Sequence, residues 1–341
     1  MRVLITGGAG FIGSTFTRYL LKNHPSCEVV VVDALTYAGN LDNLYTGPTT
    51  NERLTFWYGD VTNSDLMNEL LKGMDYVVHF AAESHVARSI SHNKIFFSTD
   101  VLGTQTIANA VLKNRQTLRG FIHISSSEVY GTALESPMSE EHPLMPSTPY
   151  AAAKAGADRL VYSYAVTYGM PAVIVRPFNV YGPHQHLEKV VPRFITSILL
   201  GEPLTVHGVG DSSRDWLYVE DLCNALDRLL GADFDSLKGQ VINIGTGKET
   251  TIMELAQTIL EKMGNKDYPI KHLLERPGQV QKHICDWRKA SKVLGWKPQV
   301  PLQQGFDETI AWYQSHRDWW MSRLCMKHVA VKDAEGKTCL Y

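Results

Sequence analysis

The sequence has few features of a secreted or membrane-spanning protein. Its 341 residues include only five cysteines, which are odd in number, scattered, and spaced neither as zinc ligands nor as a disulfide framework. No apolar run reaches membrane-spanning length, and the first strand-like run, Met1 to Thr6, leads straight into a glycine-rich turn with no room for a signal peptide. These absences predict a protein of the reducing cytoplasm.

An excess of charge of one sign is also missing. The 33 basic and 35 acidic residues leave a formal net charge of -2, so no long-range field favours a nucleic acid or an anionic membrane. The histidines, including His85, show no metal-ligand spacing, and we find no internal repeat or low-complexity tract. Any anionic ligand must therefore be bound by local groups.

The first half of the chain alternates short β-branched runs with longer amphipathic stretches. Expected strands cover residues 2–5, 28–32, 54–57, 76–80, 120–124 and 172–175. Such alternation, with right-handed crossovers, predicts an α/β fold with a doubly wound parallel sheet of the Rossmann type and helices on both faces. We assign residues 1–178 to this Rossmann-type domain.

The rhythm changes beyond about residue 179. Shorter strands are expected at 204–206 and 241–244, and a helix from Ile252 to about Met263. Residues 179–323 are expected to form mainly a smaller α/β substrate domain, with chain crossings between the two domains left open. Residues 324–341 are mostly polar and aperiodic, so we expect a frayed tail.

A glycine-rich turn follows the first expected strand. Gly7, Gly10 and Gly13 have the spacing GxxGxxG and precede an expected helix, whose N-terminus and backbone N–H groups suit a pyrophosphate. Asp33 ends the second strand, where a carboxylate binds an adenosine ribose and repels a 2′-phosphate, which favours NAD over NADP. Its alternative role is that of a turn residue, and Asp60 is either an adenine contact or only a cap.

Polar residues with catalytic potential follow the fifth strand and begin the next helix. Tyr150 and Lys154 lie four positions apart, so both project from one helix face, and a nearby ammonium favours the phenolate that would act as a base. Ser126 and Glu128 lie at the carboxyl edge of the sheet, where α/β folds bind ligands. The alternatives are a surface Tyr/Lys pair, a polar turn and a solvated loop charge.

Together, these motifs resemble the extended short-chain dehydrogenases/reductases over roughly residues 1–320. Within them the chain is most similar to NDP-sugar 4,6-dehydratases, in particular dTDP-glucose 4,6-dehydratases. The similarity is carried, in order, by residues 33–41, 81–86, 188–192, 214–221 and 317–320.

The resemblance implies an internal redox cycle on a nucleotide-activated hexose. Tyr150 would deprotonate the C4 hydroxyl while NAD takes the C4 hydride. The new carbonyl acidifies the C5 proton, which Glu128 would remove before water leaves from C6 and the hydride returns there. A simple 4-epimerase needs no base at C5, so Glu128 is the discriminating residue.

One departure bears on that chemistry. Ser127 stands where dTDP-glucose dehydratases have an aspartic acid, and a hydroxyl is a much weaker proton donor. Water or Glu128 itself would then supply the proton. Hydroxyl-Glu sequences resemble GDP-mannose 4,6-dehydratases and UDP-glucuronate decarboxylases, so a decarboxylase or a 4-epimerase is the alternative. A non-catalytic NAD-binding sensor or scaffold is an alternative of another class. Smaller departures are Ala87 and residues 276–280.

The resemblance also implies the site residues and a homodimer, whereas the histidine spacing, the balanced charge and the lack of long apolar runs predict no metal, nucleic-acid or membrane partner. The catalytic set is Ser126, Ser127, Glu128, Tyr150 and Lys154. The NAD set is Gly7, Gly10, Phe11, Ile12, Gly13, Asp33, Leu35, Thr36, Asp60, Val61, Ala81, Ala82, Thr99, Tyr150 and Lys154. The substrate set is Ser84, Ser126, Asn179, Glu188, Lys189, Arg214 and Arg276. The two arginines suit a diphosphate, with surface ion pairs as the alternative.

Overall fold

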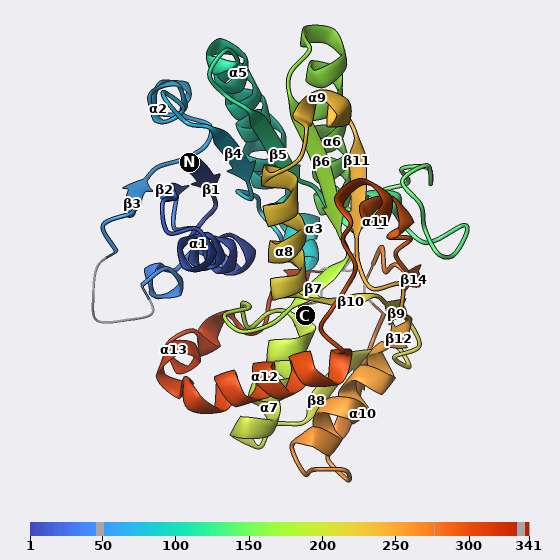
Figure 1. Cartoon of the computed structure of the whole chain (residues 1–341). Helices are drawn as coiled ribbons and strands as arrows, with labels where there is room; N and C mark the ends of the chain where they lie inside the picture. The colour runs from blue at the N-terminus through green and yellow to red at the C-terminus, as the bar shows by residue number, and fades with distance from the viewer. Residues whose placement is uncertain (46–50, 276, 333–337, 341) are drawn as a thin grey trace.

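A seven-stranded parallel sheet forms the centre of the molecule, in the order β11-β6-β5-β4-β1-β2-β3 (Figure 1). The structure is a computed structural model that describes residues 1–45, 51–275, 277–332 and 338–340. The predicted doubly wound parallel sheet is confirmed, and the six expected strands are all present. The strands are β1 (Arg2–Thr6), β2 (Glu28–Asp33), β3 (Leu54–Tyr58), β4 (Tyr76–His79), β5 (Gly120–Ile124), β6 (Ala172–Pro177) and β11 (Val241–Ile244).

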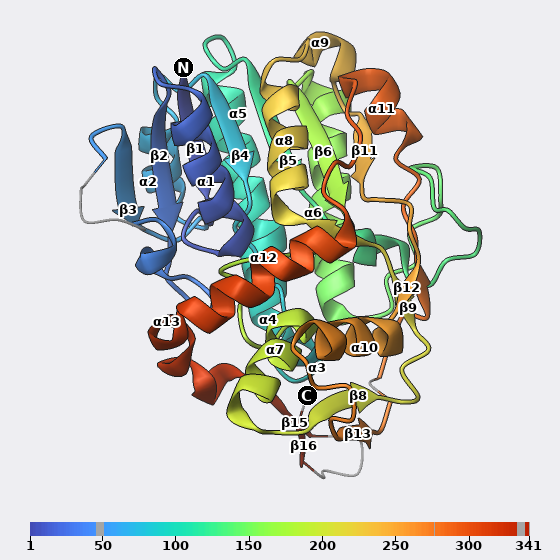
Figure 2. The ribbon, with the colours of Figure 1, turned by 60° about the horizontal axis from the view of Figure 1, so that its bottom comes forward.

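Helices cover both faces of this sheet (Figures 1 and 2). Neighbouring residues of β1 point to opposite faces, so Val3 and Ile5 join one hydrophobic core and Leu4 joins the other. Burial on both faces explains why the strands have continuous apolar runs. One face carries α1 (Phe11–Asn23), α8 (Val219–Leu230), α9 (Phe234–Leu237) and α11 (Arg288–Leu294), and the other α2 (Ser64–Leu70), α5 (Thr104–Asn114) and α6 (Pro149–Tyr168).

The chain returns to the large sheet after residue 179. Strand β11 pairs in parallel with β6, with Val241 opposite Ile174, and α8 packs on α1. The sequence left such a crossing open. Strand β11 was expected as part of the second domain, but it joins the large sheet as its seventh strand. A four-residue apolar run predicts a strand but carries no information about the sheet that it joins.

The remaining elements form a second layer at the carboxyl edge of the sheet. Figure 2 shows α12 (Leu302–Ser315) running between the large sheet and α7 (Val190–Leu200) and α10 (Ile252–Lys262). Helix α10 confirms the helix expected there. Around these helices lie α13 (Arg317–Met321) and the small pairings of β7 (Asn179–Tyr181) with β10 (Trp216–Tyr218), β8 (Leu204–His207) with β13 (Ile270–Leu273), and β9 (Ser213–Arg214) with β12 (Thr250–Thr251) and β14 (Lys282–His283).

The C-terminal segment packs on the body of the protein, which differs from the frayed tail that we expected. Lys327 is buried and donates to Glu202 at 2.6 Å, and Val329 packs on Ala87 of α3 (Val86–Ser91). Strands β15 (Ala330–Lys332) and β16 (Thr338–Leu340) then form an antiparallel pair. Within the described ranges, no helix has the length and apolar character to cross a membrane.

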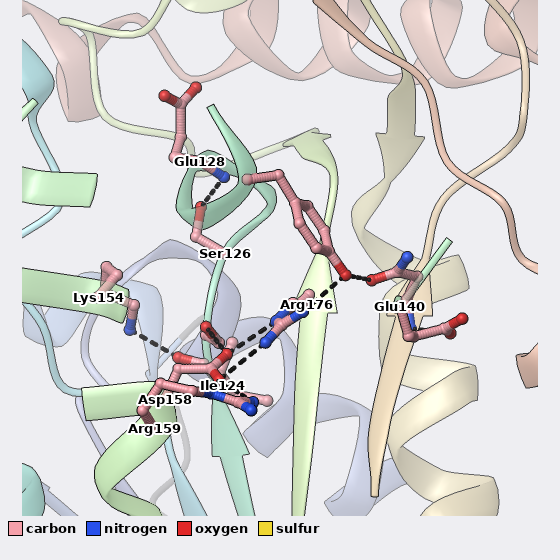
Figure 3. Close-up of polar contacts among 11 residues, drawn as sticks. Ile124, Ser126, Glu128, Glu140, Lys154, Asp158, Arg159 and Arg176 are labelled. Atoms are coloured by element: carbon pink, nitrogen blue, oxygen red, sulfur yellow. Dashed lines mark hydrogen bonds and ion pairs between the residues drawn. The ribbon is translucent and has the colours of Figure 1, made fainter. Parts of the chain in front are cut away.

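Buried polar contacts hold α6 against the ends of β5 and β6 (Figure 3). Asp158 of α6 accepts two hydrogen bonds from Arg176, at 2.8 and 2.9 Å, and one from Ser125 at 2.7 Å. One turn earlier, Lys154 Nζ donates to the Ile124 carbonyl at 2.7 Å. Burial alone would raise the pKa of Asp158, but the bonds and charge of Arg176 outweigh it and lower that pKa. The start of α6 is thereby held at the carboxyl edge of the sheet.

We expect Asp158→Asn to lower the free energy of unfolding by about 3 kcal/mol or more, because it leaves the Arg176 guanidinium buried without a counter-charge. Urea unfolding followed by circular dichroism measures this loss. The matched control is Arg159→Ala, because Arg159 pairs with the same carboxylate but its own side chain is 42% exposed. This variant should lower the free energy of unfolding by about 1 kcal/mol or less. Equal losses in the two variants would contradict the importance of the buried pair.

Candidate active site

A cavity of about 440 Å³ lies at the carboxyl edge of the large sheet, lined from both layers, and is of a size typical of ligand pockets. It brings together almost every site residue expected from the sequence. Leu35 packs against the hydrophobic core instead, and Arg276 lies outside the described residues. The lining includes Gly7, Gly10, Phe11, Ile12, Gly13, Asp33, Thr36, Asp60, Val61, Ala81, Ala82, Ser84, Thr99, Ser126, Ser127, Glu128, Tyr150, Lys154, Asn179, Glu188, Lys189 and Arg214.

The glycine-rich turn leaves no room for side chains. A Cβ on Gly13 would lie 2.4 Å from the Gly7 carbonyl oxygen, and one on Gly7, where φ is +68°, would lie 2.6 Å from the Ala81 nitrogen. Helix α1 begins after Gly10, and among the described residues no side chain caps its N-terminus. The first N–H groups of α1 are therefore available to an anion, so this turn fits the pyrophosphate of a dinucleotide.

The two acidic residues at the dinucleotide end both act in turns and both line the cavity. Asp33 accepts hydrogen bonds from the Ala9 and Leu35 N–H groups at 2.9 and 2.8 Å. Burial raises the pKa of Asp33, although these backbone bonds oppose the rise. Asp60 accepts from the Thr62 N–H and hydroxyl, both at 2.8 Å. The structure thus shows the turn contacts of both residues, and their contacts with a ribose or an adenine stay predictions that their position at the cavity allows.

A tight turn after β5 places Glu128. The short helical turn η3 (Ser127–Tyr130) is capped by Ser126, whose hydroxyl oxygen accepts the Glu128 N–H at 3.2 Å. Figure 3 shows the Glu128 carboxyl pointing away from the Asp158–Arg176 pair. Ser127, next to it, is buried at 3% exposure and also lines the cavity. Glu128 therefore lies at the cavity wall, as expected of a residue at the carboxyl edge of the sheet, and is not the solvated loop charge of the alternative interpretation.

Tyr150 and Lys154 share one face of α6 at the cavity, but their electrostatics differ from our expectation. Burial raises the pKa of Tyr150; hydrogen bonding from Ser126 opposes the rise, and the charges of Asp100 and Glu128 add to it. We expected the Lys154 ammonium to lower this pKa, whereas its amine donates to the Ile124 carbonyl. Burial also lowers the pKa of Lys154, and the carboxylates of Asp100 and Asp158 oppose that change.

Asp100 is a buried acid near this pair that sequence reasoning missed. It lies in the π-helical segment η2 (Phe97–Gly103), and its Oδ1 accepts the Glu83 N–H at 2.8 Å. Its Oδ2 has no hydrogen-bond partner among the described residues. Burial raises the pKa of Asp100 to about 7, and the charge of Lys154 opposes the rise. One indication of its role is present in the sequence, because Asp100 directly follows Thr99, a residue predicted to contact the cofactor.

Hydrogen bonds hold the expected sugar-side residues in place. Glu188 is buried and accepts from Arg88 Nε at 3.2 Å, and Lys189 Nζ donates to the Ser84 carbonyl at 2.7 Å. The Arg88 guanidinium carbon lies 4.2 Å from the centre of the Tyr37 ring, which is a cation–π contact. Sequence reasoning missed Arg88 and Tyr37, because their role depends on contacts between distant segments.

Two further expected substrate residues are buried at the cavity. Arg214 is 4% exposed and donates to the Ser213 carbonyl at 2.9 Å, so it is no surface residue. Asn179, on β7, has a buried Oδ1 without a hydrogen-bond partner among the described residues. A buried amide oxygen in this state is an available acceptor for a ligand hydroxyl. The described residues contain no group of three or more His, Cys, Asp or Glu arranged to hold a metal ion.

Known proteins with similar sequences show which family the chain belongs to. The model of the GDP-mannose 4,6 dehydratase family matches residues 4–309. The chain belongs to this family, among the extended short-chain dehydrogenases/reductases. The low-salt glycan biosynthesis protein Agl12 of Haloferax volcanii is 44% identical, covering 92% of this chain and 98% of its own. The dTDP-glucose 4,6-dehydratase of Streptomyces niveus is 41% identical, covering 94% and 95%.

Solved structures of family members and of epimerases share the fold. DesIV, a dTDP-glucose 4,6-dehydratase from Streptomyces venezuelae solved with NAD and TYD bound, is 39% identical, covers 95% of this chain and all of its own, and has a TM-score of 0.90. The UDP-glucuronic acid 4-epimerase of Bacillus cereus, solved with UDP-glucuronic acid and NAD, is 31% identical over 92% and 99%, with a TM-score of 0.86. The fold therefore does not separate a dehydratase from an epimerase, and the site must.

We expect Gly13→Ala to weaken binding of NAD, the dinucleotide held by DesIV, by roughly tenfold or more, because the new Cβ forces the turn open. Calorimetric titration with NAD measures the affinity. The control is Gly169→Ala, at a φ of +67° with nothing within 4 Å of the added Cβ. This variant should lose some stability from backbone strain and bind NAD as the wild type does. Unchanged affinity in Gly13→Ala would place the dinucleotide elsewhere.

Proposed function

We propose that this protein is an NAD-dependent enzyme that dehydrates a nucleotide-activated hexose to its 4-keto-6-deoxy form. The observation that carries the proposal is the meeting of Glu128, Tyr150 and the glycine-rich turn at one cavity. Bound NAD supplies the acceptor for the C4 hydride and its later donor. Membership of the 4,6-dehydratase family supports the same reaction.

In this proposal Tyr150 deprotonates the C4 hydroxyl, assisted by the hydroxyl of Ser126. Burial raises the pKa of the Tyr150 phenol, so Tyr150 acts as a base only when positive charge lies close to its oxygen. Lys154 on the same helix face and the nicotinamide of NAD supply that charge. Asn179, Arg214 and Arg276 are proposed to bind the nucleotide sugar.

Glu128 is the proposed base at C5, and it distinguishes dehydration from simple epimerisation at C4. A second candidate, favoured by the buried Ser127 beside it, is decarboxylation of a nucleotide-linked uronic acid. That reaction also begins with oxidation at C4 but needs no acid for a leaving hydroxyl. The mass of the product separates the candidates, because dehydration removes one water, decarboxylation removes carbon dioxide and epimerisation removes nothing.

We expect Glu128→Gln to reduce formation of the 4-keto-6-deoxy product by about 100-fold or more, the usual loss when a general base is removed. Oxidation at C4 should persist, since Tyr150 and Lys154 are untouched. Mass spectrometry of the nucleotide sugar and the near-ultraviolet absorbance of reduced nicotinamide follow the two steps. Glu135→Gln, at an exposed position, is the control. A wild-type product that has lost carbon dioxide, or has kept its mass, would contradict the dehydratase.

We also propose a cytoplasmic homodimer. Exposed apolar side chains on neighbouring elements η2 and α6 support the dimer: Leu102, Tyr162 and Val166 are 55%, 42% and 65% exposed. Tyr162 and Val166 are four residues apart and so share one face of α6. Exposed apolar surface of this kind is typical of a protein interface. The free thiols of Cys27, Cys223, Cys285 and Cys325 support the cytoplasm.

We expect Val166→Glu to convert the dimer into a monomer, because a buried carboxylate at the interface would lack a partner. Size-exclusion chromatography with light scattering measures the mass. Val209→Glu, at a loop position that is 69% exposed, is the control and should leave the mass unchanged. A wild-type protein that is already monomeric would contradict the dimer.

A further inference from the structure

The turn after β5 supplies one carboxyl, Glu128, where dehydration needs both a base and an acid. Elimination across C5 and C6 takes a proton from C5 and gives one to the departing C6 hydroxyl. Glu128 lines the cavity, but its neighbour Ser127 carries only a hydroxyl, which does not release a proton readily. On the proposed function, water or Glu128 itself supplies that proton; if Glu128 performs both transfers, its carboxyl needs a stable hydrogen-bond partner while it carries the proton.

His283 has the geometry of such a partner. It lies in β14, is fully buried, and its Nε2 is 2.5 Å from the Gly131 carbonyl oxygen. A carbonyl oxygen only accepts, so Nε2 carries the hydrogen and Nδ1 carries the lone pair. That Nδ1 lies 3.9 Å from Glu128 Oε1 and has no hydrogen-bond partner among the described residues. A buried acceptor without a donor thus faces the carboxylate.

The surroundings of His283 keep its imidazole neutral. Burial lowers the pKa of His283, and the charges of Arg214 and His142 lower it further. The charge of Glu128 and the bond to the Gly131 carbonyl act in the opposite direction. The ring of Phe178 packs edge-on against the imidazole, with the ring centres 6.2 Å apart. Because the imidazole stays neutral, Nδ1 keeps its lone pair and can accept a hydrogen bond.

We propose that His283 is a positioning residue that allows Glu128 to act first as the base at C5 and then as the acid at C6. Once Glu128 has taken the C5 proton, its new O–H donates to Nδ1 of His283. Roughly 1 Å of movement by Glu128 Oε1 brings this pair to hydrogen-bond distance. The imidazole thereby holds the protonated carboxyl beside the leaving hydroxyl, and it does not itself touch the sugar.

The step is balanced within the sugar and Glu128. In the 4-keto sugar, the C5–H electron pair becomes the C5=C6 bond, and the C6–O pair leaves with oxygen. The proton from C5, carried by Glu128, converts the departing hydroxide into water. No electrons are exchanged with another group, and Glu128 ends ionised as it began. His283 gains no proton overall.

Two substitutions of His283 test this role. His283→Gln keeps a donor for the Gly131 carbonyl but offers no acceptor at the Nδ1 position, whereas His283→Asn places an amide oxygen near that position. We expect elimination to slow roughly ten- to hundredfold in the Gln variant and to recover substantially in the Asn variant. Oxidation at C4, followed by reduced nicotinamide, should persist in both. Ser127→Asp in the His283→Gln background should restore elimination by supplying a separate acid.

Several results would overturn the proposal. Equal losses in the Asn and Gln variants, a parallel loss of C4 oxidation, or no rescue by Ser127→Asp would each assign His283 a structural role only. If neither variant folds, the rate of elimination by the wild-type protein is measured against pH. The logarithm of this rate should fall at low pH with a slope of two protons if the reaction needs both a neutral His283 and an ionised Glu128. A slope of one proton would contradict the proposal. A wild-type protein that shows no C4 oxidation on any nucleotide sugar would instead refute the proposed function.

Discussion

The attachment of α6 to the carboxyl ends of β5 and β6 is the constraint on which the site depends. Lys154 donates to the last carbonyl of β5, and Asp158 pairs with Arg176 of β6, all away from water. Buried polar groups are costly unless paired, so this arrangement has essentially one low-energy register. That register places Tyr150, at the start of α6, at the same cavity as Glu128, which follows β5.

Burial excludes water from the site, and it also disfavours the charged forms of the catalytic residues. The same desolvation that excludes water raises the pKa of Tyr150 and lowers that of Lys154, so each group resists the charged form that catalysis needs. The surrounding acids, Asp100 among them, favour a charged lysine but oppose a phenolate. A ligand that adds positive charge near Tyr150 would lower the pKa of its phenol. Cofactor binding would therefore favour the phenolate that acts as the base.

The sequence predicted what local patterns determine. The strands follow from continuous apolar runs, and the turn from glycines at Gly7 and Gly13 whose neighbours leave no room for a Cβ. The rest depends on contacts between distant segments. The pairing of β11 with β6, the bond from Lys154 to a backbone carbonyl, and the approach of His283 to Glu128 across 155 residues of sequence have no local signature. A lone histidine in a short strand is indistinguishable from a core residue.

The central claim is that one acid–base carboxyl, Glu128, and one phenol, Tyr150, act on the same sugar ring from the large-sheet side of the cavity. A crystal structure of the Glu128→Gln protein with NAD and an intact nucleotide hexose tests it most directly. We predict residue 128 facing C5 and C6, and the Tyr150 hydroxyl within hydrogen-bond distance of the C4 oxygen. A hexose bound with residue 128 on its far side, or a dinucleotide lodged outside the glycine-rich turn, would contradict the account.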